Sequence, residues 1–356
     1  MTTANYKELL DKLLLEVIKQ GASDLHLSEG RLPHIRVNGE LIPMNNHEIL
    51  DSKTTSGILN SMISDLFREE FEAKKELDFS YSFENETRFR GNAFIQQGHV
   101  GIVLRLITNV LRTLSELNLP PILETFARRK QGFFLVVGPV GQGKSTTLAA
   151  MVDLINSERA EHIITIENPI EYIYTQKKSI VDQREVRLDT HDFDSALLGT
   201  FRQDVDVILV GEMRGKETIA AAVTAAETGH LVFSTLHTNN ASQTIDRIID
   251  SFPGDQQDQI RVQLAGSLIG IFSQRLIPRI AGGMVPAYEL LINNNAVANL
   301  IREKRTYEID TVIETGSEHG MIDMNRTLAD LVRKGEITAE NAYVHSFRPE
   351  MLDRLI

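Results

Sequence analysis

Hydrophobic and polar positions in the first third of the chain follow two different periods. Between Tyr6 and Gln20 the apolar residues recur at helical spacing, which predicts an amphipathic helix ended by Gly21. A second helical pattern covers residues 54–71. Strict alternation predicts strands over residues 24–28, 33–37, 78–83, 88–94 and 102–106, with a hairpin turn at Asn38 and Gly39. We therefore expect an α+β domain over residues 1–107 and a linker over residues 108–114.

The remaining residues, 115–356, alternate short apolar runs with good helix formers. The runs cover residues 133–137, 163–166, 207–210 and 231–235. Such alternation predicts an α/β domain with a mainly parallel sheet. Each run ends in a polar cluster, and ligands bind beyond the carboxyl ends of parallel strands, so these clusters should meet at one site. Further along we predict a helix over residues 256–274, a strand near 285–291 and a helical tail.

A phosphate-binding loop of the pattern G-x-x-x-x-G-K-[ST] joins the first run to the helix after it. It consists of Gly138, Pro139, Val140, Gly141, Gln142, Gly143, Lys144, Ser145 and Thr146. Its glycines let backbone N–H groups approach phosphates, and the helix N-terminus adds a positive dipole. Lys144 would reach the β- and γ-phosphates, and the Ser145 hydroxyl would ligate Mg²⁺. The sequence therefore predicts ATP and Mg²⁺ as cofactors.

Two acidic clusters follow two of the other predicted strands. Glu167 and Glu171 flank a turn at Pro169, where a carboxylate could orient or deprotonate the water that attacks ATP. A solvated loop with a salt bridge is the alternative for this segment. The apolar run 207–210 ends at Gly211 and Glu212, and Glu212 could act on Mg²⁺ directly or through water.

His230 and His237 stand at the two ends of the run 231–235. Their spacing does not fit the i, i+4 pair of a helical zinc site, and no cysteine assists them. They are candidates for neutral groups that sense the γ-phosphate. Capping or ordinary hydrogen bonding in the core remains the alternative for each of them.

Arginine is the remaining candidate for the phosphate chemistry, because it stabilises charge on a transferred phosphoryl group. Arg90 and Arg105 lie on neighbouring predicted strands of the first domain. From the residues alone, a surface position is the simpler interpretation, since most arginines are exposed. Arg202 and Arg275 have the same status.

Composition excludes several other classes of protein. The chain has 356 residues, which suggests about two domains. A formal net charge of −12 argues against a nucleic-acid partner, and the lack of cysteine excludes disulfides and thiolate metal sites. No apolar run reaches the length of a membrane span, and the N-terminal residues predict a charged helix and no signal peptide. We expect a cytoplasmic protein without direct membrane insertion.

Four motifs together resemble the secretion-type ATPases of type IV pili and type II secretion. They occupy residues 23–28, 164–171, 206–214 and 235–239. Their order and spacing make the resemblance specific, and it covers nearly the whole chain. Within the family the retraction enzymes are most similar, because the chain lacks a four-cysteine zinc motif and carries the amphipathic segment 296–303.

The resemblance implies a homohexameric Mg²⁺-dependent ATPase that powers pilus retraction and twitching motility. Each subunit would have a PAS-like N-terminal domain and a RecA-like P-loop domain with a helical C-terminal tail. The implied partners are an inner-membrane pilus platform protein and a paralogous retraction ATPase, at the inner face of the cytoplasmic membrane. A ring subunit that depends on a second ATPase is the alternative.

The resemblance also assigns roles to individual residues. It implies Glu171 as the catalytic glutamate, Glu212 as the Walker B glutamate, and His230 and His237 as the histidines of a conserved box. Arg90 and Arg105 would close onto the nucleotide, which reverses the surface interpretation given above. The chain departs from the family pattern in having Asn168 where aspartate is usual, and Val140 and Gln142 within the phosphate loop. Asn168 removes one negative charge near the metal.

Overall fold

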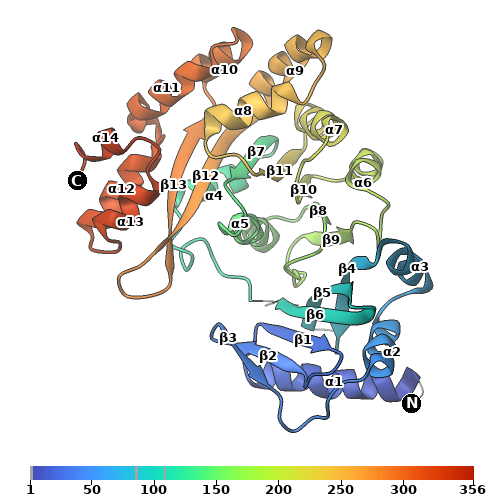
Figure 1. Cartoon of the computed structure of the whole chain (residues 1–356). Coiled ribbons are helices and arrows are strands. Elements are labelled where there is room, and N and C mark those ends of the chain that lie inside the picture. Colours follow the sequence, from blue (N-terminus) through green and yellow to red (C-terminus); the bar gives the residue numbers. More distant parts are fainter. Residues whose placement is uncertain (1–2, 85–86, 108–109) are drawn as a thin grey trace. The chain divides into compact units, whose positions relative to one another are not determined.

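The computed structural model describes residues 3–84, 87–107 and 110–356. It divides into two compact units, Met1–Val110 and Leu111–Ile356 (Figure 1). Two residues of the predicted linker, 108 and 109, lie outside the described residues. The predicted α/β class is confirmed, with an antiparallel sheet in the first unit and a mainly parallel sheet in the second.

The first unit is a six-stranded antiparallel sheet packed against helices. Its sheet order is β3-β2-β1-β6-β5-β4. The strands are β1 (Asp24–Ser28), β2 (His34–Val37), β3 (Glu40–Pro43), β4 (Glu76–Phe83), β5 (Thr87–Gln96) and β6 (His99–Ile107). The helices are α1 (Thr3–Lys19), α2 (Ser52–Met62) and α3 (Asp65–Lys74). Leu10, Leu13 and Leu14 of α1 are fully buried in its core, as their spacing predicts.

Two details of this unit differ from the sequence prediction. The single helix predicted over residues 54–71 is wrong, because α2 ends at Met62 and Ser64 caps a new helix by accepting a hydrogen bond from the Phe67 N–H. Strand β3 was not predicted. All four of its residues are exposed at the edge of the sheet, so they show no alternation of buried and exposed positions.

The second unit is built around a seven-stranded sheet of order β13-β12-β7-β11-β10-β8-β9, parallel except for β13. Its strands are β7 (Gly132–Val137), β8 (His162–Glu167), β9 (Ile180–Glu185), β10 (Val207–Val210), β11 (Leu231–Leu236), β12 (Leu268–Pro278) and β13 (Met284–Ile292). Its helices are α4 (Ile122–Ala127), α5 (Lys144–Glu158), α6 (Phe193–Thr200), α7 (Lys216–Glu227), α8 (Ala241–Asp250), α9 (Gly254–Ser267), α10 (Asn295–Arg302), α11 (Ile309–Thr315), α12 (Met324–Arg333), α13 (Ala339–His345) and α14 (Pro349–Leu352), with short 3₁₀ turns η1 (Thr306–Glu308) and η2 (Ser317–His319).

The four central strands predicted for this sheet are confirmed, whereas the helix predicted over residues 256–274 is wrong in its second half. Helix α9 ends at Ser267 and strand β12 begins at the next residue. Strand β12 lies between β7 and β13, and eight of its 11 residues are buried. A buried strand gives an apolar run that periodicity alone does not distinguish from a buried helix.

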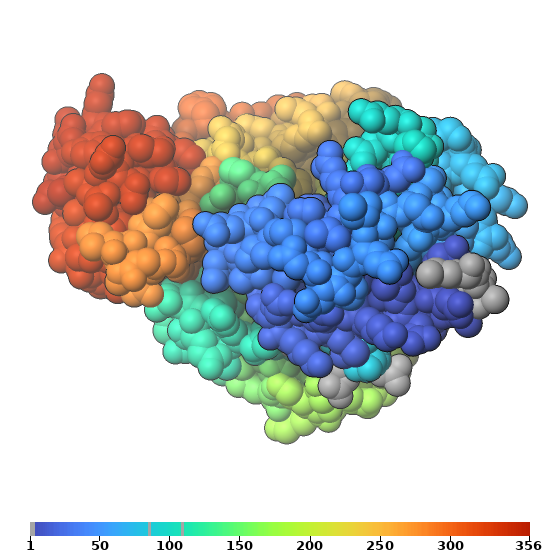
Figure 2. Space-filling model, turned by 60° about the horizontal axis from the view of Figure 1, so that its bottom comes forward, coloured from blue at the N-terminus to red at the C-terminus, as the bar shows by residue number. Residues whose placement is uncertain are grey.

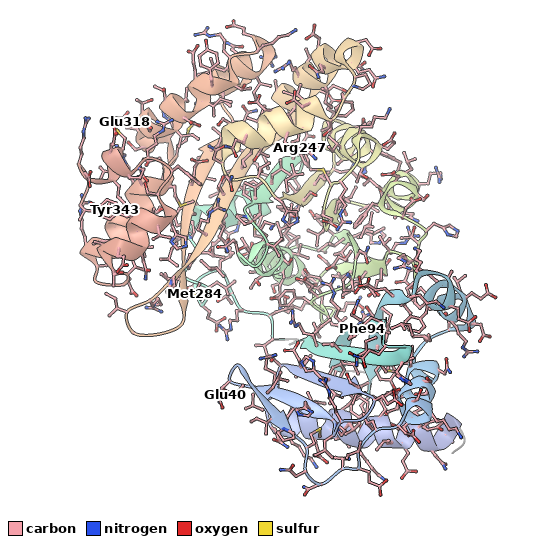
Figure 3. The ribbon with its side chains drawn as sticks, in the orientation of Figure 1. Glu40, Phe94, Arg247, Met284, Glu318 and Tyr343 are labelled. Atoms are coloured by element: carbon pink, nitrogen blue, oxygen red, sulfur yellow. The ribbon has the colours of Figure 1, made fainter. Side chains whose placement is uncertain are left out.

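The C-terminal helices form a small core of their own. Residues of α12 and α13, with Leu352 of α14, pack against Ile277, Val285 and Ala287 of the β12–β13 hairpin. Figure 2 shows these helices as a red mass beside the orange hairpin. Met284, at the start of β13, lies near the tip of this hairpin and Tyr343 lies on α13 (Figure 3). In the described parts of the chain, no helix combines the length and the apolar character that a membrane span requires.

Candidate active site

The phosphate loop connects the carboxyl end of β7 to the first turn of α5, as the sequence predicts. Three of its glycines, Gly138, Gly141 and Gly143, have positive φ angles of 148°, 77° and 79°. At Gly138 a side chain is also excluded by space, because a Cβ would lie 2.5 Å from the backbone oxygen of Gln274. The loop is therefore built tightly against β12 and tolerates only glycine at its first position.

Lys144 is held inside the loop before any ligand is considered. Its side chain is 7% exposed, and its Nζ donates hydrogen bonds to the carbonyl oxygens of Gly138 at 2.8 Å and Pro139 at 2.9 Å. Burial lowers the Lys144 pKa to about 8, while the charges of Glu171 and Glu212 oppose that shift. The loop thus places a cation whose own charge is poorly solvated, which favours an anionic ligand.

Two glutamines lock the loop to β12. The Gln274 side chain accepts a hydrogen bond from the Thr147 hydroxyl at 2.6 Å and donates one to the Gln142 carbonyl at 2.8 Å. In return, the Gln142 side-chain oxygen accepts the Leu276 N–H at 2.7 Å. Sequence reasoning missed Gln274 because it assigned this segment to a helix. The unusual Gln142 is explained by this lock, since its side chain contacts the neighbouring strand.

His237 and Glu212 complete the neighbourhood of the lysine. His237 Nδ1 lies 3.3 Å from Lys144 Nζ, and His237 Nε2 lies 3.7 Å from a carboxylate oxygen of Glu212. Burial and the charge of Lys144 lower the His237 pKa, so the ring is neutral at neutral pH. Because an ammonium group has no acceptor, Nδ1 must accept and the ring proton lies on Nε2, facing Glu212.

A cavity of about 600 Å³ opens beside these side chains. Glu212, His237, Thr238 and Arg247 are among the residues that line it. Arg214 also lines it and holds Glu212 by an ion pair of 2.7 Å. Arg247 comes from α8, where Figure 3 labels it. A volume of this size suits a small-molecule ligand.

The loop after β8 carries Glu171, the predicted catalytic carboxylate. Glu171 is exposed, and its negative charge raises the pKa of Lys144. Glu167, at the end of β8, is 8% exposed and accepts a hydrogen bond from the Thr165 hydroxyl at 2.7 Å. Burial raises the Glu167 pKa to about 7. The Thr146 and Tyr172 hydroxyls lie 2.8 Å apart and join the start of α5 to this loop.

His230 is not brought to the phosphate loop. It precedes β11, and the residue after it, Leu231, pairs with Gly132 at the start of β7, whereas the loop follows the end of β7. Its Nδ1 lies 2.9 Å from the Ala225 carbonyl oxygen. The predicted nucleotide contact of His230 therefore has no support within this unit, and local hydrogen bonding accounts for the residue. Only His237 stands at the loop's end of the strand.

The predicted arginines occupy contrasting environments. Arg90 and Arg105 are direct partners on β5 and β6 of the first unit, which confirms that they lie on neighbouring strands. Both are exposed, and Arg105 donates to Asp24 at 2.8 Å. Arg202 is exposed as well, whereas Arg275 is 6% exposed on β12. The surface interpretation is therefore wrong for Arg275.

Comparison with known proteins places this geometry in a family. Residues 2–304 match the family described as type II/IV secretion system proteins. The type IV pilus retraction ATPase PilT of Pseudomonas aeruginosa is 45% identical over 341 residues, which cover 96% of this chain and 99% of that protein. The type IV pilus ATPase PilU of the same organism is 41% identical, covering 94% and 88%. A crystal structure of the pilus retraction motor PilT with bound ADP has a TM-score of 0.90 at 45% identity, covering 97% of this chain and 98% of that one.

Proposed function

The chain belongs to the type II/IV secretion system protein family and is a PilT-like ATPase, and we propose that it powers type IV pilus retraction, and so twitching motility, by ATP hydrolysis. The observation that carries the chemistry is the position of Lys144. Its Nζ sits inside the phosphate loop, 3.3 Å from His237, and His237 reaches toward Glu212. A buried cation, a neutral imidazole and a carboxylate thus converge where the γ-phosphate of ATP would lie.

Each of these side chains has a distinct role in the proposed reaction. Backbone N–H groups of residues 140–146 and the Lys144 ammonium group bind the β- and γ-phosphates. The residues suit Mg²⁺, because Ser145 offers a hydroxyl at the start of α5 and Glu212 a carboxylate beside the loop, and Mg²⁺ prefers such oxygen ligands. When bound, Mg²⁺ would neutralise charge on the phosphates. His237 lies between Lys144 and Glu212, with its proton on Nε2 facing Glu212, and would couple the binding of the γ-phosphate at Lys144 to the position of Glu212.

Glu171 is proposed to orient the attacking water and accept its proton. Its support is electrostatic proximity, since the Glu171 charge is close enough to Lys144 to raise that residue's pKa. Glu167 lies in the same segment but is buried and bonded to Thr165, so it suits a supporting role in this loop. Asn168 would leave Glu171 and Glu212 as the carboxylates of the site.

The assembly around the site is proposed from the family resemblance. We propose a homohexamer of subunits that each contain a PAS-like domain in residues 1–107, a linker and a RecA-like domain in residues 115–356. Arg90 and Arg105 lie side by side on one face of the first sheet and are proposed to stabilise charge on the transferred phosphoryl group. The ring would act in the cytoplasm on an inner-membrane pilus platform protein, without nucleic acid.

A second candidate function is an accessory ring subunit of the PilU type, which would need a paralogous ATPase for retraction. The 41% identity to PilU and the presence of Asn168 favour keeping this candidate. The two candidates differ in whether the purified chain hydrolyses ATP alone.

Release of phosphate from Mg²⁺-ATP by the purified full chain tests the proposal. Lys144→Ala provides the blank, Glu171→Gln removes the proposed base, and Glu318→Gln is the matched control at an exposed glutamate (Figure 3). We expect turnover in the parent chain and in Glu318→Gln, and its loss in Glu171→Gln. A folded hexamer that binds ATP without turnover would contradict an independent motor and favour the accessory subunit.

A further inference from the structure

Arg275 is a buried cation that the proposed chemistry leaves without a role. Its guanidinium group lies against the first residue of the phosphate loop, because a Cβ placed on Gly138 would be 3.3 Å from Arg275 Nη1. Its Nη2 donates to the side-chain oxygen of Asn239 at 2.8 Å, two residues beyond His237. Arg275 therefore touches the loop and the segment that carries its histidine.

The third contact of Arg275 is with the C-terminal strap, which we define as residues 346–348. The guanidinium carbon lies 5.3 Å from the centre of the Phe347 ring, within the range of a cation–π interaction. Phe347 belongs to the segment between α13 and α14. A residue far along the chain thus forms one wall of the environment of Arg275.

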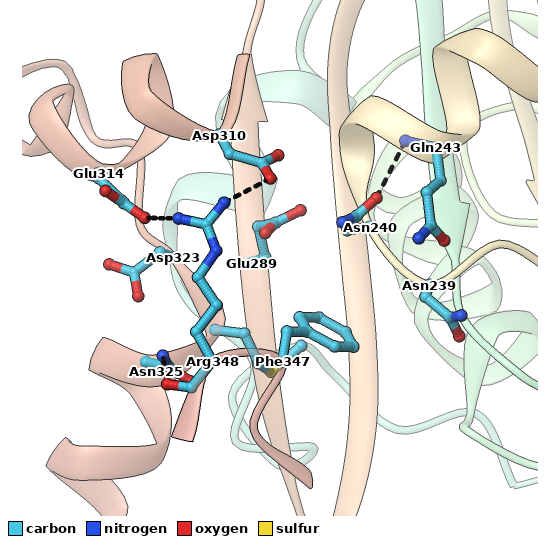
Figure 4. Close-up of a pocket in the computed structure, with 11 residues that line it drawn as sticks. Asn239, Asn240, Gln243, Glu289, Asp310, Glu314, Asp323, Asn325, Phe347 and Arg348 are labelled. Carbon is cyan, nitrogen blue, oxygen red and sulfur yellow. Dashed lines mark hydrogen bonds and ion pairs between the residues drawn. The ribbon is translucent and has the colours of Figure 1, made fainter. Parts of the chain in front are cut away.

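The strap is itself anchored to α11 and α12. Arg348 makes ion pairs with Asp310 at 2.8 Å and Glu314 at 2.6 Å, both on α11 (Figure 4). Asn325 donates to the Arg348 carbonyl at 3.0 Å and accepts the Ser346 hydroxyl at 2.7 Å. These contacts hold Phe347 in place from both of its neighbours.

A cavity of about 280 Å³ lies beside the strap, and Phe347, Arg348, Asn239 and Glu289 are among its lining residues (Figure 4). The buried Glu289 carboxylate attracts Arg275 from this side. The charge of Glu289 thus acts on Arg275, whose guanidinium group lies against the first residue of the phosphate loop. A bound polyphosphate adds negative charge on the loop side only, which changes the balance of forces on Arg275.

We propose that Arg275 is a positioning residue that couples the phosphate loop to the C-terminal strap, so that nucleotide binding alters the contact between Arg275 and Phe347. The inference rests on nucleotide binding at the loop, proposed above. Phosphate charge draws the guanidinium group toward the loop and away from the aromatic ring. Asn239 accepts a hydrogen bond from Arg275, so the segment after β11 moves with the guanidinium group. The strap then transmits it through Arg348 to α11.

The coupling is measurable because the chain contains no tryptophan. Phe347→Trp keeps an aromatic face over Arg275 and introduces the chain's single tryptophan at the strap, where it can be excited selectively over the tyrosines. Tyr307→Trp, at a residue that is 73% exposed, is the matched control for unspecific effects of nucleotide. The probe is ADP, with its binding measured independently by equilibrium dialysis and the fold checked by circular dichroism.

We expect ADP to shift the emission of Phe347→Trp but not that of Tyr307→Trp. The shift should persist with Arg275→Lys and disappear with Arg275→Met in the Phe347→Trp background, while ADP still binds. Phe347→Ala should change ADP affinity by roughly fivefold, the lower end of typical coupling, and Phe347→Tyr should restore it.

Three outcomes would overturn the inference. The first is unchanged Phe347→Trp emission when dialysis shows the loop saturated with ADP. The second is a Phe347→Ala chain with a lower melting temperature and unaltered ADP affinity, which would mean that the strap is only structural. The third is failure of the parent chain to bind ADP, which would reject the proposed nucleotide site itself and is recognised by dialysis alone.

Discussion

The lowered pKa of Lys144 predicts that nucleotide affinity depends on pH above neutrality. In the chain without ligand, burial brings this pKa to about 8. A phosphate group beside Nζ favours the charged lysine and returns the pKa toward its ordinary range. Binding is then accompanied by proton uptake. Affinity is therefore full at pH values below about 8 and falls as the pH rises through that value.

The size of the effect follows from the same pKa. At a pKa of about 8, Lys144 is about nine-tenths protonated at pH 7 and about one-tenth protonated at pH 9. Affinity should therefore fall by about tenfold over this range, or about 1.4 kcal/mol. Other groups in contact do not add to it, because His237 is already neutral and the phosphate ionises near pH 6. Arg275 remains charged throughout, because arginine is not deprotonated in proteins.

Isothermal titration of ADP at pH 7, 8 and 9 measures this dependence, with excess Mg²⁺ throughout. Comparing two buffers of different ionisation enthalpy at each pH counts the protons taken up. Lys144→Arg is the control, because arginine stays charged over the whole range and should flatten the profile. A parent chain whose affinity changes by less than about twofold, or a Lys144→Arg chain with the same slope, would refute the reasoning.

Three further substitutions test the packing around the site. Glu289→Gln should raise the melting temperature at pH 8 and leave it unchanged near pH 4.5. Burial raises the Glu289 pKa to about 7 in the folded chain, above its value in the unfolded chain, so the free energy of unfolding falls by about 3 kcal/mol as the pH rises from 4.5 through 7 and the buried group ionises. Destabilisation by Glu289→Gln at pH 8 would contradict this. Gln274→Ala should reduce the free energy of unfolding by about 1–3 kcal/mol in urea titrations, because the Thr147 hydroxyl and the Gln142 carbonyl lose their partner; an unchanged midpoint would argue against the lock. Gly138→Ala should abolish ADP binding in dialysis, since its Cβ meets the Gln274 backbone, whereas Gly141→Ala has open space and should retain more binding; equal losses would show that φ strain dominates.

The local features of this protein could be read from its sequence. The phosphate loop depends on glycines and on Lys144, all within nine consecutive positions, and those glycines permit the positive φ angles of its backbone. The four central strands were predictable because each is a short apolar run with polar residues at its end. Both carboxylates, Glu171 and Glu212, follow such runs, so their arrival at one edge of the sheet could also be foreseen.

Tertiary structure decided the features that depend on neighbours distant in sequence. Segment 268–278 is a strand because β7 and β13 bury it on both sides, and this burial turns Gln274 toward the loop and encloses Arg275. His230 and His237 are alike in sequence context, and the parallel pairing of β11 with β7 determines that only His237 reaches Lys144. The stacking of Phe347 on Arg275 joins residues 72 positions apart, and no local pattern encodes such a contact. Periodicity reports which face of an element is buried, whereas the partner that buries it is set by the packing of the whole unit.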